Sequence, residues 1–250
     1  MIAAIRCEAV KAARSLVGII ALVAYVGGVT ALCSVVIALA RSGDTQLIAK
    51  LGSSVTDDWA GLVSAAAQIA GAGGFVASGV VASWIFAREF ADRTISRLFA
   101  LPVSRGRIAI AKTAVFALWN LAAAVLTLAL LLIAGTALGL GAPSPDEWAA
   151  LVRIPVLVVL TALAVLPVAW VASITGSLLA AIGSAVGLLV VTQVGVLSGS
   201  GGWMPFAAPA LWAMSGGAAV TIGQLALTGC VGAVALAATV VVWRRLQLDR

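Results

Sequence analysis

The feature that most constrains the fold is a series of apolar segments, each long enough to cross a bilayer. The segments are residues 16–40, 62–86, 108–140, 154–173, 178–197 and 218–243. A helix needs about 20 mostly apolar residues to span the hydrocarbon core, and in lipid only helices and closed barrels satisfy their own backbone groups. The sequence therefore predicts an all-α membrane protein with six transmembrane helices, forming one domain over residues 1–250.

The composition excludes a soluble protein. Hydrophobic residues make up 63% of the chain and charged residues only 10%, whereas soluble domains average about 45–50% and about 25%. The net charge of +6 does not indicate a nucleic-acid partner, because the basic residues lie at the ends of the apolar segments. Membrane topology explains that placement, and we expect membrane lipid rather than nucleic acid around the chain.

Two segments outside the spans have patterns of their own. Residues 1–15 predict an amphipathic interfacial helix, with Ile5, Ala9 and Ala12 on one arc and charged residues on the other, namely Glu8, Lys11 and Arg14. Residues 198–217 are rich in glycine, proline and tryptophan and carry no charge. They predict short interfacial or re-entrant helices on the outer side, between the fifth and sixth spans.

The basic residues also predict an orientation. Twelve of them fall on the side of the chain ends, and three fall on the other side: Arg41, Lys50 and Arg153. Because short cytoplasmic segments carry the excess of Lys and Arg, both termini are expected in the cytoplasm. The expected location is the cell membrane of a bacterium or archaeon.

The sequence argues against an enzyme. It has no histidine, and its three cysteines have neither metal-site nor disulfide spacing. The membrane cores of the predicted spans contain no Asp, Glu, Lys, Arg or His, which disfavours ion-coupled transport. No GxxxxGK[ST] motif is present, so the chain is not expected to bind ATP itself.

One segment, Phe86–Lys112, concentrates six basic and two acidic side chains. Arg88 and Asp92, and likewise Glu89 and Arg93, have the i,i+4 spacing of helical ion pairs. Pro102 is expected to end this first helical stretch, because its ring disfavours helical geometry in the preceding residue. Ser104 is a suitable N-cap for a new helix that begins at Arg105. The simplest interpretation is a cytoplasmic loop that follows the positive-inside rule.

The pattern in this segment resembles the one that follows the second span of ABC-2 type transporter permeases, most closely the branch that exports drugs and peptide antibiotics. The matching residues are Glu89, Thr94, Ile95, Leu98, Leu101, Pro102, Val103, Ser104, Arg105, Ile108 and Lys112. In that family the segment is a coupling helix that rests on a separate ATPase. The resemblance thus implies an ATPase-coupling site made of Arg88, Glu89, Asp92, Arg93, Thr94, Ile95, Arg97, Leu98, Phe99, Pro102 and Arg105.

The resemblance also implies partners and roles. Two copies of an ATPase would bind ATP and Mg²⁺, and the permease would form a homodimer or pair with a similar permease. Glu89 and Arg93 would hold the shape of the segment, and Thr94–Phe99 would face the ATPase. Arg105 and Lys112 are expected to anchor the third span to lipid headgroups. The first, second and fifth spans would line the path of a small amphipathic or apolar substrate, such as a drug, an antibiotic or a lipid.

Several polar residues lie inside the predicted spans, among them Gln68, Asn120 and Gln193. Such side chains commonly hydrogen-bond between helices, and they can also line a translocation path. Both interpretations remain open for these three residues. A second hypothesis for the whole chain is a membrane protein of the same fold that does not transport, such as an immunity, sensor or assembly factor.

Overall fold

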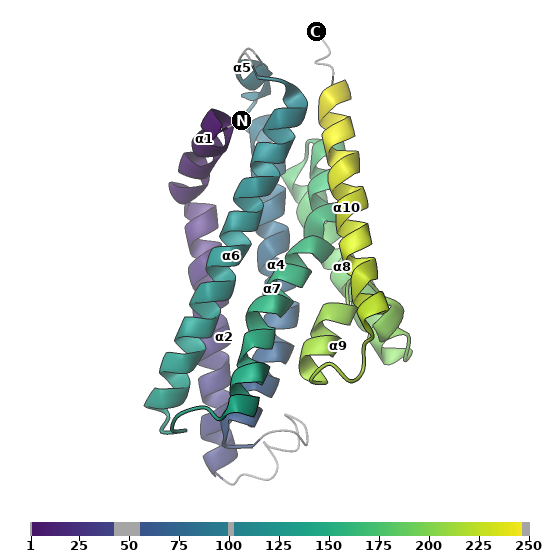
Figure 1. Cartoon of the computed structure of the whole chain (residues 1–250). Helices are drawn as coiled ribbons and strands as arrows, with labels where there is room; N and C mark the ends of the chain where they lie inside the picture. The colour runs from purple at the N-terminus through teal and green to yellow at the C-terminus, as the bar shows by residue number, and fades with distance from the viewer. Residues whose placement is uncertain (1, 43–55, 100–102, 247–250) are drawn as a thin grey trace.

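The protein is a bundle of long helices (Figure 1). The computed structural model describes residues 2–42, 56–99 and 103–246, and these contain no strand. The elements are α1 (Ile2–Ala13), α2 (Leu16–Ser42), α4 (Trp59–Ala91), α5 (Ile95–Phe99), α6 (Arg105–Ala137), α7 (Pro145–Thr175), α8 (Leu178–Leu197), η1 (Gly201–Trp203), α9 (Ala208–Met214) and α10 (Ile222–Arg245). Six of them are long and apolar enough to cross a membrane, which confirms the expected six spans.

The spans differ from the predicted ones mainly at their ends. Helix α7 begins at Pro145 rather than near residue 154, because Ser144 and Glu147 form a capping box around its first turn. Pro155 therefore lies inside the helix and not in its first turn as expected. Helix α4 likewise extends to Ala91, so that the first part of the charged segment continues the second span.

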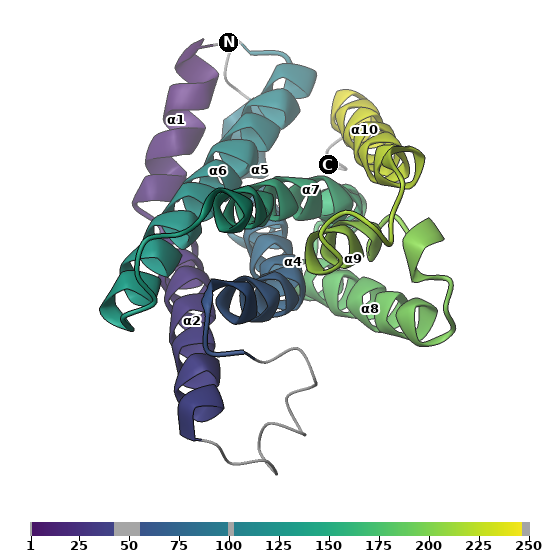
Figure 2. The same cartoon turned by 60° about the horizontal axis from the view of Figure 1, so that its bottom comes forward.

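Helices α4 and α7 form the centre of the bundle. In the most apolar part of each, 56% of the residues are buried, against 22% in α8 and in α10. Figure 2 shows α2 and α6 on one side of this central pair and α8 and α10 on the other. Small buried residues such as Ala82 on α4 and Ala169 on α7 let the helices approach closely.

Helix α1, α5 and the C-terminal end of α10 lie together at one end of the bundle, which we call the α5 end (Figure 1). The two short elements η1 and α9 join α8 to α10 well away from this end (Figure 1). The short helices expected between the fifth and sixth spans are therefore present. Their depth in a membrane stays a prediction.

The close approach of α4 and α6 generates a prediction about packing. A Cβ atom at Gly135 would lie 2.2 Å from Cη2 of Trp59, whose side chain is 2% exposed and has no room to move. We expect Gly135→Ala to reduce the free energy of unfolding by about 1–3 kcal/mol through overpacking. Thermal unfolding of the purified protein in detergent measures this. Gly183→Ala is the matched control, because nothing lies within 4 Å of its Cβ position. Equal melting temperatures for the two variants would contradict the prediction.

Candidate functional site

The α4 helix ends in a Schellman turn that places α5. The N–H of Thr94 donates to the Glu89 carbonyl at 2.9 Å, and the N–H of Arg93 donates to the Phe90 carbonyl at 3.1 Å. Arg93 adopts a φ of 54°, a left-handed conformation that glycine adopts more readily than other residues. The two backbone hydrogen bonds of this turn therefore fix the direction in which the chain leaves α4.

Neither local ion pair expected in this segment forms. Among the described residues, no ion pair joins Arg88 with Asp92 or Glu89 with Arg93. The Arg88 guanidinium instead lies 4.5 Å from the centre of the Trp84 ring, a cation–π contact. The expectation that Glu89 and Arg93 pair was wrong, because Glu89 is turned into the bundle and is 3% exposed.

Helix α5 is a single five-residue helix that packs against the end of α4. Leu98 is buried and belongs to the main apolar cluster, and Ile95 packs against the same cluster. Ser96 points away and is exposed. Of the expected Thr94–Phe99 face, Leu98 thus faces the bundle rather than a partner. The side chains of Arg97 and Phe99, and the whole of Pro102, lie outside the described residues.

The buried partner of Glu89 is Lys112 of α6. Lys112 Nζ lies 2.8 Å from Oε2 and 2.9 Å from Oε1 of Glu89, and it also donates to the Ile85 carbonyl at 2.8 Å. The Lys112 side chain is fully buried. We expected it to reach the lipid headgroups, and that expectation was wrong because a carboxylate and a carbonyl bind the ammonium inside the bundle.

Helix α1 completes this ion cluster. Glu8 Oε2 lies 3.0 Å from Lys112 Nζ, and Lys11 Nζ lies 2.5 Å from Glu8 Oε1 and 3.3 Å from Glu89 Oε1. The cluster of Glu8, Lys11, Glu89 and Lys112, which we call the ion quartet, joins α1, α4 and α6. The predicted helix at residues 1–15 is present, but one of its charged residues, Glu8, faces the bundle instead of water.

The two residues that α1 contributes to the ion quartet have shifted pKa values. Burial alone would raise the pKa of Glu8, but the charges of Lys112 and Lys11 outweigh it, so the pKa lies below the usual 4.5. Burial alone would lower the pKa of Lys11, but hydrogen bonding and attraction to Glu8 and to Glu89 raise it above 10.5. Both groups are therefore charged at neutral pH, and the contact of α1 with the bundle is ionic there.

Arg105 begins α6, as the sequence predicted. The helix starts after Ser104, although the Ser104 side chain makes no capping hydrogen bond. Arg105 Nη1 donates to the Leu246 carbonyl at the end of α10. Arg105 thus ties the start of the third span to the end of the sixth.

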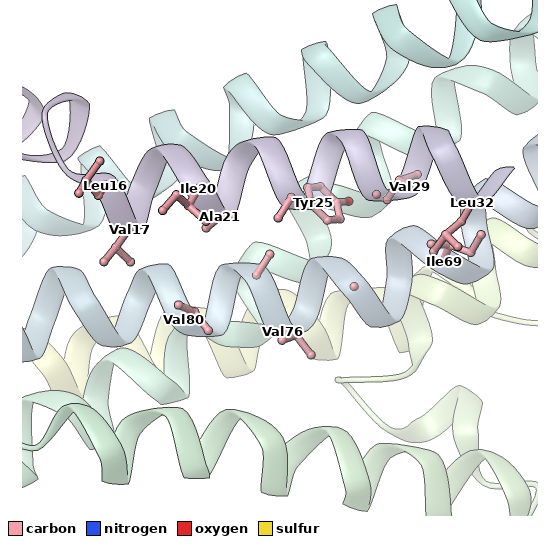
Figure 3. A pocket seen from close by; sticks show the side chains of 14 residues that line it. Leu16, Val17, Ile20, Ala21, Tyr25, Val29, Leu32, Ile69, Val76 and Val80 are labelled. Atoms are coloured by element: carbon pink, nitrogen blue, oxygen red, sulfur yellow. The ribbon is translucent and has the colours of Figure 1, made fainter. Parts of the chain in front are cut away.

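A groove of about 650 Å³ runs between α2 and α4. Figure 3 shows that Tyr25 and Val29 of α2 and Ile69 and Val76 of α4 are among the side chains that line it. Its other lining residues are also aliphatic or glycine, and Tyr25 supplies the one phenol. The substrate path was expected to be lined by the first, second and fifth spans. This groove is lined by the first and second spans, α2 and α4.

The three polar residues proposed for a path lie in two different places. Gln68 of α4 and Gln193 of α8 are exposed and line one hollow of about 390 Å³, which α9 helps to form. Asn120 is buried inside the bundle, where its Oδ1 accepts from Ser78 Oγ at 2.6 Å and its Nδ2 donates to the Phe116 carbonyl. Asn120 joins α4 to α6 and lines neither hollow.

Comparison with known proteins places the chain in a family. Residues 4–193 match the family model described as ABC-2 family transporter protein, which covers α1 through most of α8. The chain therefore belongs to the ABC-2 transporter family and is the membrane-spanning permease type of protein that its helices indicate. A search of curated proteins gave no match.

The ion quartet generates a prediction about stability. In Lys112→Met, Glu8 and Glu89 would remain buried, and among the described residues Lys11 would be the one cation left paired with them. Because an uncompensated buried charge is strongly unfavourable, we expect a loss of about 3–5 kcal/mol in the free energy of unfolding. Thermal unfolding in detergent measures it, with Arg14→Met as a control cation that is exposed and outside the quartet.

A triple variant, Glu8→Gln with Glu89→Gln and Lys112→Met, should recover much of this loss because no buried charge is then left without a partner. Lys11, whose side chain is 27% exposed, can then reach water. If Lys112→Met unfolds at the same temperature as Arg14→Met, the quartet does not stabilise the fold.

The pKa of Glu8 predicts how pH affects the docking of α1. A lowered carboxyl pKa stabilises the fold above the ordinary value of 4.5, and this stabilisation is lost as the pH falls through the shifted value. We expect a constant melting temperature from about pH 6 to 8 and a decline below about pH 4.5. The decline should be smaller in Glu8→Gln, measured across the same pH series. A Glu8→Gln profile that parallels the wild type would contradict this role.

Proposed function

We propose that this permease is the membrane subunit of an ABC exporter, driven by a separate ATPase that docks at the α5 end. The observation that supports this most directly is the form of α5. A short helix is fixed to α4 by a Schellman turn and by the buried Leu98, yet it leaves Ser96 and the neighbouring Asp92 and Arg93 exposed. A rigidly held element with a polar exposed face is suited to receive a push from a partner.

The ion quartet would transmit such a displacement to three helices. Glu89 lies on the last turns of α4, immediately before the turn to α5, and it binds Lys112 of α6 and Lys11 of α1. A displacement of α5 would move Glu89 and, through these ionic contacts, the end of α1 and the first turns of α6 with it. Because α4 packs along α7 in the centre of the bundle, the motion would reach the membrane part of the protein.

The energy would come from the partner. The chain has no motif for cradling nucleotide phosphates, so ATP and Mg²⁺ would be bound by two ATPase subunits beneath two permeases. The permeases would be two copies of this chain or this chain and a similar one. The α5 end, with both chain ends, would face the cytoplasm of a bacterial or archaeal cell. The chain would itself catalyse no reaction.

The cargo would be a small amphipathic or apolar compound, such as a drug, an antibiotic or a lipid-like molecule. The groove between α2 and α4 is lined by aliphatic side chains and offers no ionic partner to a charged guest. The hollow that contains Gln68 and Gln193 adds two amides, which can hydrogen-bond a polar group of the same guest. Export rather than import is the direction that the sequence resemblance implies.

The exposed face of α5 generates the test. Ser96→Trp places a bulky side chain on that face without touching the buried Leu98, and we expect it to abolish copurification of the ATPase and ATP-dependent transport. The measurement is a mild-detergent pull-down from the native host followed by an ATPase assay. Thr136→Trp is the control, because Thr136 is exposed at the far end of α6.

Two outcomes would contradict the proposal. An ATPase that still copurifies with Ser96→Trp at the wild-type ratio would show that α5 is not the docking face. A wild-type preparation with no associated ATPase would favour a protein of this fold that does not transport.

A further inference from the structure

The ends of α4, α7 and α10 enclose a hollow at the α5 end of the bundle, which we call the α7–α10 hollow. It has a volume of about 530 Å³, and it is lined by Phe90 of α4, by the last residues of α7 with Gly176, and by residues at the end of α10. Among the described residues that line it, Arg245 is the only charged one. The hollow therefore combines one basic side chain with a largely apolar wall.

Buried contacts between the three helices hold the wall of this hollow in place. Trp243 Nε1 donates to Ser173 Oγ at 2.9 Å, which joins α10 to α7. The Trp243 ring meets the Phe90 ring nearly edge to face, with centroids 6.1 Å apart, which joins α10 to α4. Gly176 lies so close to α4 that a Cβ atom there would be 3.1 Å from the Phe90 ring. The hollow is thus a product of helix packing and exists before any ligand binds.

The end of α7 contributes hydrogen-bond acceptors to the hollow. Helix α7 ends at Thr175, and the N–H of Gly176 donates to the Ala172 carbonyl at 3.0 Å. Within the described part of the chain, no backbone N–H donates to the carbonyls of residues 173–175, and all three residues line the hollow. Because the last carbonyls of a helix carry partial negative charge, this wall favours a ligand that is a cation and a hydrogen-bond donor.

The end of α10 contributes the opposite charge. Arg245 is exposed, and over residues 2–42, 56–99 and 103–246 it makes neither an ion pair with a carboxylate nor a hydrogen bond to the end of α7. The hydroxyls of Ser173 and Thr175 each donate to a carbonyl one turn earlier in α7, so they are already used within that helix. The hollow therefore presents a guanidinium group on α10 and carbonyl acceptors on α7.

Exposed aliphatic side chains border this polar pair. Ile174 of α7 is 55% exposed and Val241 of α10 is 44% exposed, and both line the hollow. Val241 lies one turn before Arg245, on the part of α10 that leads into the apolar span. An acyl chain can therefore extend from the hollow along side chains that face the membrane.

We propose that the α7–α10 hollow binds the headgroup of a phospholipid that carries both a phosphate and a primary ammonium group, as phosphatidylethanolamine does. Arg245 binds the phosphate, because its planar fork donates parallel hydrogen bonds to phosphate oxygens. The carbonyls at the end of α7 accept from the ammonium group. Basic pockets between membrane helices are known to bind lipid headgroups. The inference does not rest on the proposed coupling to an ATPase, because the lipid binds to the permease alone.

The experiment uses the full chain, purified and delipidated in a nonionic detergent. Native mass spectrometry compares three lipids with the same acyl chains: phosphatidylethanolamine, phosphatidylcholine, whose quaternary ammonium has no N–H, and phosphatidylglycerol, which has no ammonium group. We expect phosphatidylethanolamine to bind most tightly. We expect Arg245→Gln to reduce the affinity for phosphatidylethanolamine about fivefold, because one basic side chain near a headgroup is removed.

The matched control is Arg244→Gln, which removes the same charge one residue earlier, from a different hollow between α6 and α10. It should keep the wild-type affinity, and melting temperatures check that both variants are folded. The comparison among lipids uses the wild-type chain, so it tests the proposal even if a variant unfolds. Equal losses in the two variants, or binding of phosphatidylcholine or phosphatidylglycerol as tight as that of phosphatidylethanolamine, would overturn the proposal. Equally tight binding of glycerophosphoethanolamine, which has no acyl chains, would overturn the assignment to a membrane lipid.

Discussion

The buried charge of Lys112 is the constraint on which the α5 end of the protein depends. An ammonium group that is fully buried in a helix bundle must have its charge balanced and its donors satisfied. Glu89 supplies a nearly symmetrical pair of oxygens, and Glu8 supplies a third from a helix that does not cross the bundle. Helix α1 is therefore attached to the bundle through Glu8, whose carboxylate helps to balance the buried Lys112. At this point three helices of the otherwise apolar bundle are held in fixed register.

The rest of the bundle is held differently. Away from the α5 end, small side chains and a few neutral hydrogen bonds, such as Ser78 to Asn120, join the helices. These contacts are individually weak and non-ionic, and in lipid they gain little from the hydrophobic effect. The protein thus combines an adaptable apolar body with a buried ionic cluster at one end. That distribution would suit the proposed exporter, in which helices would shift in the membrane while the element that receives the force would keep its shape.

The sequence predicted the spans well because hydropathy depends on each segment alone. It also predicted the start of α6 at Arg105, because N-cap signals are local in the sequence, although the Ser104 side chain makes no capping hydrogen bond. Prediction from the sequence failed where a charged residue can pair with a residue far away in the chain. Glu89 has a cation four residues away, so the local pair was the natural expectation, and nothing in one sequence indicates that Lys112 competes for it. Lys112 was assigned to the headgroups for a similar reason, because a lysine near a helix end usually extends to water. The site that joins α1 to α6 could be found only in three dimensions.

The order of these residues along the chain has a consequence for how the protein is made. Glu8 leaves the ribosome 81 residues before Glu89 and 104 residues before Lys112, the cation that balances both carboxylates inside the bundle. Until α6 has been synthesised and inserted, α1 has no buried site to occupy, and Glu89 would enter the membrane boundary without its principal counter-ion. The arrival of Lys112 is therefore the step at which the nascent chain can close its first helices into a unit, so α1, although synthesised first, docks after the third span.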